Sequence, residues 1–366
     1  MTTTRNEQSA DLTNGTAVKM ETEQHVNSAD SINCSAGKDQ IQPSRICIFV
    51  HYNKNNTVAP GIEPYLKGLQ SICSEIIFIS NSKLPLPDQE LLETLVTKVL
   101  TRTNQGMDFG AWKTAIDRVG WEHIELFDEL VLANDSCYAP LHSFEEMFNA
   151  MRDSTGDFWG VTEHRAASVK SGNLRAHLQS YFLVFTRKVV LSSAFRKFWS
   201  DVSGNQTNYD SIVKNSEATL TPCLNDAGFK HDVYLKEKSF IGKHQGGNWE
   251  NPLYFNHTIW SWNNLLAHRS PFLKRRAIPF HLERASRLIH SGYGRKVTKA
   301  AYLQTFFWRD CLGKYQSAYP IDIIHTDIQS QVPATLDNPS QRLSRILFHL
   351  GGPRRLLLQL KRKLQG

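Results

Sequence analysis

Short polar stretches follow apolar runs in the N-terminal part of this sequence, and their side chains are well suited to chemistry. In an open α/β sheet, ligands bind where parallel strands end, because loops from several strands meet there. Glycines in such loops let a backbone approach a ligand, and a helix that starts there attracts an anion. We predict that four stretches converge on one crevice: His51-Tyr52-Asn53, Asn81-Ser82, the segment 104–110 with Asn104, Gly106, Asp108 and Gly110, and Asn134-Asp135-Ser136.

Two carboxylates in these stretches are candidates for different tasks. Asp135 directly follows the apolar residues 130–133, where a carboxylate can ligate a divalent cation, Mg²⁺ or Mn²⁺, that neutralises a diphosphate. Asp108 lies between two glycines and could accept a hydrogen bond from a ribose or a base. The structural alternatives are a turn residue at a strand end for Asp135 and a helix N-cap for Asp108.

Glu217, Trp159, His177 and Gln179 have weaker support from the sequence. Glu217 could be a general base that removes a proton from a hydroxyl group, although a surface carboxylate on a helix is the common alternative. Trp159 could stack on a sugar ring, or it could be a core residue, as most tryptophans are. His177 and Gln179 share one face of a predicted strand, where a buried histidine with satisfied hydrogen bonds is the ordinary case.

Alternating strand and helix patterns around these residues predict an α/β fold. Apolar runs rich in β-branched residues predict buried strands at 45–50, 75–80, 97–101 and 129–133. Helices must connect such strands if they are parallel neighbours. We therefore expect a mostly parallel sheet flanked by helices. Further strands are predicted at 157–162 and 177–185, and further helices at 60–74, 89–96, 111–119, 143–151, 187–201 and between Thr221 and Gly228.

Composition excludes several classes of protein. The chain has 366 residues, of which 40% are hydrophobic, so it can bury a sizeable core. A formal net charge of +7 suits an anionic ligand or an anionic membrane surface. The six cysteines show no CxxC spacing, so neither a zinc site nor a disulfide framework is expected. The sequence shows no nucleic-acid-binding motif, no signal peptide and no long apolar stretch, so we expect a cytoplasmic protein without a nucleic-acid partner.

The charge and composition change along the chain and indicate four segments. Residues 1–43 are polar and almost free of aromatic residues, which predicts a disordered tail before the α/β domain at 44–265. Residues 266–340 are rich in Lys and Arg and are predicted to form a basic, mainly helical C-terminal extension. Residues 341–366 combine leucines with basic residues, a basic amphipathic pattern that favours contact with anionic membrane lipid or, alternatively, a solvated helix.

Five motifs follow one another in a fixed order: Asn104-x-Gly106-x-Asp108-x-Gly110-x-Trp112-Lys113, residues 132–136 with Pro140, residues 157–162, residues 177–182, and Glu217 with Leu220 and Gly228-Phe229. Asn251-Pro252, Trp262 and Pro271-Phe272-Leu273-Lys274 lie further along the chain. Over about residues 45–280, the five motifs resemble the rhamnan synthesis protein F family, and the later residues resemble the C-terminal part of that family.

The resemblance implies a GT-A-like glycosyltransferase with a nucleotide-binding sheet, which builds a rhamnose-containing polysaccharide or lipopolysaccharide. It implies a nucleotide-sugar donor, dTDP-rhamnose, and a lipid-linked glycan acceptor at the inner face of the cell membrane. Two differences from the family pattern are Asn53, where many relatives have Asp, and the single carboxylate of Asn134-Asp135-Ser136, where a DxD motif has two. The implied donor-binding residues are His51, Tyr52, Asn53, Asn81, Asn104, Gly106, Asp108, Asn134 and Ser136, and the implied catalytic residues are Glu217 and the metal ligand Asp135. Apart from the resemblance, we predict that Trp159, His177 and Gln179 bind the acceptor.

The sequence as a whole therefore predicts an inverting glycosyltransferase. Glu217 would deprotonate an acceptor hydroxyl, while Asp135 and a divalent cation would stabilise the leaving diphosphate. The alternative is a non-catalytic subunit that binds a sugar nucleotide or a glycan for another enzyme. Turnover of a donor would separate the two.

Overall fold

The computed structural model describes residues 42–169, 172–203, 213–240, 256–277, 319–320, 322–324 and 326. Residues 43–366 cluster as one compact unit and Met1–Gln42 as another. The predicted tail lies outside the described residues except at its last two positions, as do the amphipathic segment 341–366 and most of the extension 266–340. In the part of the chain that is described, no helix combines the length and the apolar character needed to cross a membrane.

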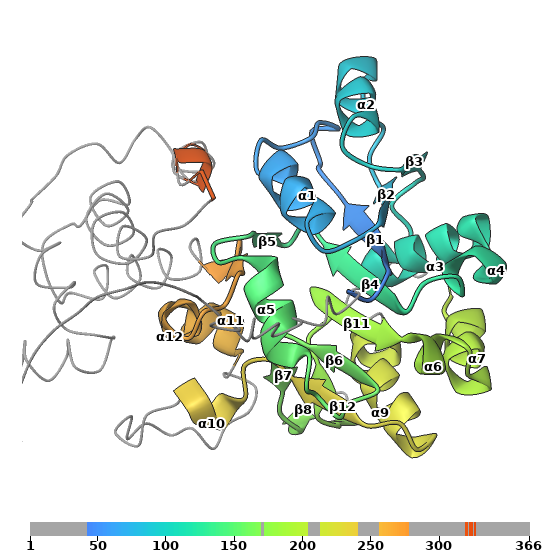
Figure 1. Cartoon of the computed structure of the whole chain (residues 1–366), viewed down its shortest axis with the longest axis vertical. Helices are drawn as coiled ribbons and strands as arrows, with labels where there is room; N and C mark the ends of the chain where they lie inside the picture. The colour runs from blue at the N-terminus through green and yellow to red at the C-terminus, as the bar shows by residue number, and fades with distance from the viewer. Residues whose placement is uncertain are drawn as a thin grey trace, which may run out of the picture. The chain divides into compact units, whose positions relative to one another are not determined.

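A seven-stranded sheet forms the centre of this unit, with the strand order β12-β6-β11-β4-β1-β2-β3 (Figure 1). Neighbouring strands are parallel except at β11, which is antiparallel to both β4 and β6. The predicted α/β fold with a mostly parallel sheet flanked by helices is confirmed. The strands are β1 (Arg45–His51), β2 (Glu75–Ser80), β3 (Lys98–Thr101), β4 (Glu129–Asn134), β6 (Phe158–Gly160), β11 (Phe182–Thr186) and β12 (His231–Val233).

Strand β1 shows why the sheet is buried on both faces. Its residues all lie in the core, and alternate side chains enter two different hydrophobic clusters: Cys47 and Phe49 in one, Ile46, Ile48 and Val50 in the other. Because successive strand residues point to opposite faces, a continuous apolar run requires helices on both sides. One face packs on α1 (Ile62–Gln70), α2 (Leu86–Glu93) and α5 (Phe144–Met151); the other packs on α3 (Met107–Val119), α4 (Trp121–Ile124), α6 (Arg187–Val190), α7 (Ser193–Asp201) and α9 (Ala218–Asp226).

All strands of the sheet but β11 point the same way, so the sheet has two chemically distinct edges. We call the edge where β1, β2, β3, β4, β6 and β12 end the carboxyl rim, and the opposite edge the amino edge. The remaining elements lie outside the sheet: β5 (Cys137–Tyr138) with β13 (Leu273–Lys274), β7 (Glu163–His164) with β10 (His177–Leu178), β8 (Ala167–Val169) with β9 (Gly172–Leu174), the π-helix η1 (Val213–Glu217), α10 (Glu237–Phe240), α11 (His257–Trp260) and α12 (Trp262–Ala267).

The predicted domain boundary at residue 265 falls inside the packed body. Phe272 and Leu273 are buried, and β13 pairs with β5. Phe272 belongs to the same hydrophobic cluster as α1 and α5. The basic composition after residue 265 hid a short apolar segment that packs on the sheet domain.

Two other boundaries differ from the prediction for local reasons. The strand predicted at 177–185 is split into β10 and β11, because residues 179–181 turn between them. The helix predicted to begin at Thr221 starts earlier, at Ala218, so Thr221 is not its N-cap residue. The Thr221 hydroxyl accepts a hydrogen bond from the Leu178 N–H. Gly228 follows the end of α9 with a positive φ of 90°, as its predicted place after a helix requires.

Candidate functional site

The loop before α3 places Asp108 at the carboxyl rim. Gly106 is the N-cap residue in the left-handed region, with φ 69°, so α3 begins at Met107 and not at Ala111 as predicted. A Cβ on Gly110 would lie 2.4 Å from the carbonyl oxygen of Gln105, so the loop would have to shift for any larger residue there. Asp108 therefore lies in the first helical turn rather than at the N-cap.

The end of β4 is tied to Asp108 and to β1. The Asn134 amide donates to Asp108 Oδ2 over 2.8 Å, and its own oxygen accepts from the Ser136 N–H over 3.2 Å. The Asp135 carboxylate accepts from the Tyr52 N–H over 3.1 Å. These bonds bring three of the four predicted stretches together at the carboxyl rim.

The fourth stretch, Asn81-Ser82, joins the same set of contacts. The Asn81 amide donates to the Met107 carbonyl over 3.3 Å, which links the end of β2 to the start of α3. The Ser82 hydroxyl accepts from the Asn53 N–H over 2.8 Å. His51 is buried, and its Nδ1 lies 3.0 Å from the hydroxyl of Ser80.

The exposed residues among the donor candidates lie in the loops of this rim. Tyr52 exposes 48% of its surface, and Asn104 is exposed in the loop before α3. An exposed aromatic ring beside the ends of β1 and β4 is available to a ligand without any rearrangement of the core. The buried members, His51, Asn81 and Asn134, hold the loops in place.

Glu217 reaches the carboxyl rim from a distant part of the sequence. It is the last residue of η1, and its Oε1 accepts from the Ser180 N–H over 3.0 Å. Ser180 lies just before β11, whose first residue is at the carboxyl rim because β11 runs antiparallel. The charge of Glu217 contributes to the raised pKa of Asp108, so the two carboxylates are close enough to interact.

The electrostatics of the site set it apart from an ordinary surface. Burial raises the pKa of Asp108 to about 6; Lys274 opposes the shift and Glu217 adds to it. Burial also raises the pKa of Asp135 to about 7, against the Tyr52 N–H and with a contribution from Asp108. Desolvated carboxylates that repel one another are typical of functional sites, and they favour a bound cation.

His177 and Gln179 are buried near the site and make their hydrogen bonds within the protein. His177 Nδ1 lies 2.8 Å from the Arg175 carbonyl oxygen, and burial lowers the pKa of its imidazole. Gln179 accepts from the Thr162 hydroxyl over 2.8 Å and donates to Asn256 over 3.1 Å. The acceptor contacts predicted for these two residues remain a prediction.

Trp159 is a core residue in this structure. It is 4% exposed and packs edge-on against Phe148, with the ring centroids 5.1 Å apart. A ring enclosed in this way has no free face for a sugar, so its predicted acceptor contact receives no support from the structure.

Lys274 is a rim residue that the sequence analysis did not assign to the site. Its ammonium donates to the Ser136 hydroxyl over 2.8 Å and lies 5.0 Å from the centre of the Tyr181 ring. The sequence placed it in the basic extension, where it looked like one surface cation among many. The apolar Pro271-Phe272-Leu273 directly before it was the available signal that this segment packs.

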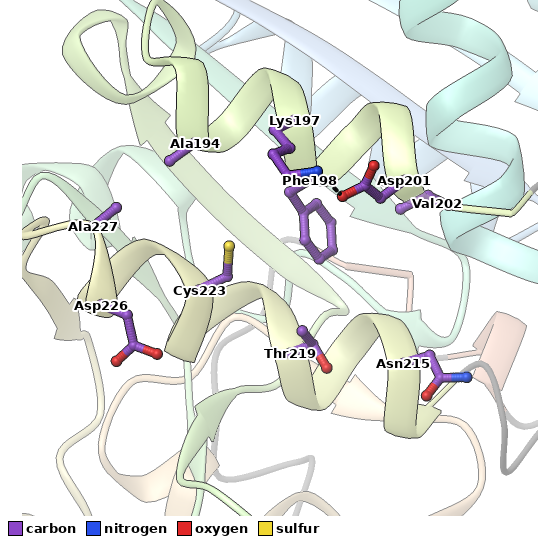
Figure 2. A pocket seen from close by; sticks show the side chains of 10 residues that line it. All are labelled: Ala194, Lys197, Phe198, Asp201, Val202, Asn215, Thr219, Cys223, Asp226 and Ala227. Carbon is purple, nitrogen blue, oxygen red and sulfur yellow. Dashed lines mark hydrogen bonds and ion pairs between the residues drawn. The ribbon is translucent and has the colours of Figure 1, made fainter.

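A cavity of about 410 Å³ lies between α7 and α9, and none of the predicted site residues lines it (Figure 2). Its walls include Phe198 and Cys223, with the Lys197–Asp201 ion pair at one side. In the described residues, no group of three or more His, Cys, Asp or Glu side chains could hold a metal ion.

The fold and the rim together define an α/β protein with an acidic site at the carboxyl ends of its strands. The chain belongs to the rhamnan synthesis protein F family, whose model matches residues 76–338. The resemblance seen in the sequence motifs is confirmed by this match.

Other similar proteins share less. A protein of Sinorhizobium fredii described as uncharacterized protein y4gN is 27% identical over 154 residues, which are 42% of this chain and 39% of that protein. Core-mannan synthase A from Aspergillus fumigatus, in a Mn/GDP form, is 9% identical with a TM-score of 0.33 over 59% of this chain and 79% of its own. S. aureus TarS 1-349 is 11% identical with a TM-score of 0.32, over 48% of this chain and 56% of the TarS chain. The family assignment thus rests on the sequence match.

Proposed function

We propose that this protein is a glycosyltransferase that moves a sugar from a nucleotide-sugar donor to a growing cell-surface glycan. The observation that supports it most is the meeting of Asp108, Asp135 and Glu217, from three distant segments, at one rim. Membership of the rhamnan synthesis protein F family supports rhamnose as the sugar and dTDP-rhamnose as the donor.

Glu217 is the proposed catalytic base. The Ser180 N–H holds one of its oxygens, which fixes the carboxylate. Among the described residues no hydrogen bond engages the second oxygen, which would accept the proton of an acceptor hydroxyl. As that hydroxyl oxygen bonds to the anomeric carbon, its proton passes to Glu217 and the bond to the diphosphate breaks. Attack on the face opposite the leaving group gives inversion.

The loops at the ends of β1, β2 and β4 are the proposed donor site. His51, Tyr52, Asn53 and Asn81 would contact the nucleoside, and the start of α3 would face the diphosphate. Gly106 and Gly110 let the loop fold tightly there, and the first turn of a helix favours an anion. Holding both reactants in place contributes much of the rate enhancement in such reactions.

Asp135, with Asp108 beside it, would hold a divalent cation, Mg²⁺ or Mn²⁺. The residues fit: both are oxygen ligands, both are partly buried, and burial together with a neighbouring carboxylate raises the pKa of each. Mg²⁺ commonly binds through one or two carboxylates plus substrate phosphates, so a set of three protein ligands is not required. Bound there, the cation would offset charge on the leaving diphosphate.

The acceptor and the cellular location are also proposals. A lipid-linked glycan at the inner face of the cell membrane suits the family and the positive net charge of +7. The basic segment 341–366 would then contact anionic lipid, with about 1 kcal/mol for each Lys or Arg near the surface. His177 and Gln179 would position the rim residues that face the acceptor.

A screen of the full chain against nucleotide sugars, with and without Mg²⁺, tests the proposal. A bound donor raises the unfolding temperature. Hydrolysis or transfer of the same donor should fall by about 10²- to 10⁴-fold in Glu217→Gln, while nucleotide affinity is kept. Glu90→Gln, at an exposed position on α2, is the matched control and should keep full activity.

Three results would decide among the functions. Loss of turnover in Glu217→Gln but not in Glu90→Gln supports the enzyme. Nucleotide binding without turnover, with any acceptor offered, would favour a non-catalytic subunit that binds sugar nucleotides. If no nucleotide or nucleotide sugar binds the wild-type chain, the proposed function is wrong.

A further inference from the structure

The C-terminal strand β13 is anchored so that its last residue faces the carboxyl rim. Phe272 is buried, with its ring centre 5.1 Å from that of Phe182 and 5.5 Å from that of Phe144. Leu273 and Lys274 pair with Tyr138 and Cys137 of β5, directly after the Asn134-Asp135-Ser136 stretch. The backbone at Lys274 is therefore fixed by the aromatic core on one side and by β5 on the other.

Among the described residues, the ammonium of Lys274 contacts only uncharged groups, although the carboxylate of Asp108 is near enough to interact with its charge. Its contacts are the Ser136 hydroxyl and the face of Tyr181. Of the residues that the structure describes, no carboxylate lies within ion-pair distance of it, although its charge acts on Asp108 nearby. An ammonium has three donor hydrogens and one hydroxyl accepts only one of them, so donors remain for a ligand.

Arg275, the next residue in the chain, is a second positively charged side chain near the rim. The Arg275 N–H donates to the Ser136 carbonyl over 3.0 Å, and its guanidinium lies 5.3 Å from the centre of the Tyr138 ring. Its charge acts on both Asp135 and His51. Two positive side chains next to β5 thus lie near the carboxylates.

We infer that Lys274 binds the diphosphate of the donor directly, with its ammonium moving from the Ser136 hydroxyl to a phosphate oxygen. This inference rests on the proposed function, and it assigns a side chain of the protein to bind the leaving diphosphate. A half-buried ammonium donates stronger hydrogen bonds to an anion than to a hydroxyl, so the exchange is favourable. As the anomeric bond breaks, the charge that develops on the diphosphate lies next to Lys274.

This placement also explains why a single carboxylate at the DxD position is sufficient. A lysine can neutralise part of the diphosphate charge, so less of that charge has to be offset by a divalent cation. Nucleoside diphosphate should therefore bind measurably even when divalent cations are removed, and Lys274 should account for that binding.

Titration calorimetry with dTDP, UDP and GDP, in EDTA and in Mg²⁺, tests the inference, with thymidine, uridine and guanosine as controls. Lys274→Met keeps the apolar stem on Tyr181 and removes the charge. It should weaken diphosphate binding by about 10-fold or more, with the larger loss in EDTA, and leave nucleoside binding unchanged. Lys274→Arg should restore part of the affinity.

Arg276→Gln is the matched control, because it removes one positive charge from an exposed position two residues away. It should change diphosphate affinity less than twofold. Thermal unfolding should show that both proteins are folded. If wild type and Lys274→Met then bind the diphosphates with equal affinity, the role of Lys274 is wrong, while the proposed function still stands. If the wild-type chain binds none of the three diphosphates, both this inference and the proposed function fail.

Discussion

The two edges of the central sheet hold acidic side chains in opposite ways. At the amino edge, Arg45 Nε lies 2.5 Å from Glu129 Oε2, and Lys188 Nζ lies 2.7 Å from Asp157 Oδ1. Hydrogen bonds from Lys188 and from the Lys230 N–H lower the pKa of Asp157. At the carboxyl rim, burial and neighbouring carboxylates raise the pKa values of Asp108 and Asp135.

The difference shows which edge stabilises the fold and which edge is arranged for a ligand. Paired carboxylates stabilise the folded state, whereas desolvated carboxylates near one another destabilise it at neutral pH. Proteins accept such a cost at functional sites. Substitutions at the amino edge should therefore reduce stability and keep activity, and substitutions at the rim should do the reverse.

Of the substitutions considered, Asp135→Asn should have the largest effect, and that effect should be a loss of activity. We expect turnover to fall by about 10²- to 10³-fold, because a ligand and a charge next to the leaving diphosphate are lost. The free energy of unfolding at pH 7, from urea denaturation, should stay the same or rise, because the asparagine oxygen can still accept from the Tyr52 N–H. A clear loss of stability with full activity would reverse our assignment of the rim.

Arg45→Met should have the largest effect on stability. Arg45 is 5% exposed, pairs with Glu129 and donates to the Ile72 carbonyl. Breaking a nearly buried pair should lower the free energy of unfolding by about 2–3 kcal/mol. Donor turnover below the unfolding transition should be unchanged, and Arg45→Lys should recover part of the stability. Loss of turnover in the folded variant would show that the edges are not independent.

Gly110→Ala should reduce both the stability of the fold and the binding of nucleotide. Its Cβ would meet the Gln105 carbonyl oxygen at 2.4 Å, so the loop before α3 must move. We expect a loss of about 1–2 kcal/mol in the free energy of unfolding, together with weaker nucleotide binding. Calorimetry and urea denaturation measure both. Unchanged values would mean that the loop is not fixed in the way this contact indicates.

Asp157→Asn should have a smaller effect, of about 1 kcal/mol, and one that depends on pH. The pKa of Asp157 in the folded protein lies below the ordinary value of 3.8, so the carboxylate stabilises the folded state above that pH. The stability difference between wild type and variant should be full near neutral pH and vanish as the pH falls through the folded pKa. A difference that persists at pH 2 would contradict an ionic origin.

The sequence was sufficient to predict the central part of the fold. Continuous apolar runs identify β1, β2 and β4, because a strand that is buried on both faces has apolar residues at successive positions. The split between β10 and β11 and the early start of α9 were missed, because both depend on contacts such as the Leu178 N–H to the Thr221 hydroxyl. Such contacts join residues far apart in the sequence.

The candidate site was partly visible in the sequence. The polar ends of parallel strands predict a common rim, and the structure does bring Asp108, Asp135 and Glu217 there. Lys274 was not assigned to the site, because its position depends on the packing of Phe272 against α5 and β11. For Trp159 the sequence left both a sugar contact and a core position open, and the structure buries the ring. Residue type alone does not tell which face of β6 is covered.

A crystal structure of the protein with dTDP and Mn²⁺ would test the central claim most directly, since the anomalous signal of manganese locates the ion. We expect the diphosphate at the carboxyl rim, with the ion on Asp135 and Lys274 on a phosphate oxygen. A nucleotide bound instead in the cavity between α7 and α9, or an ion remote from Asp135, would contradict it.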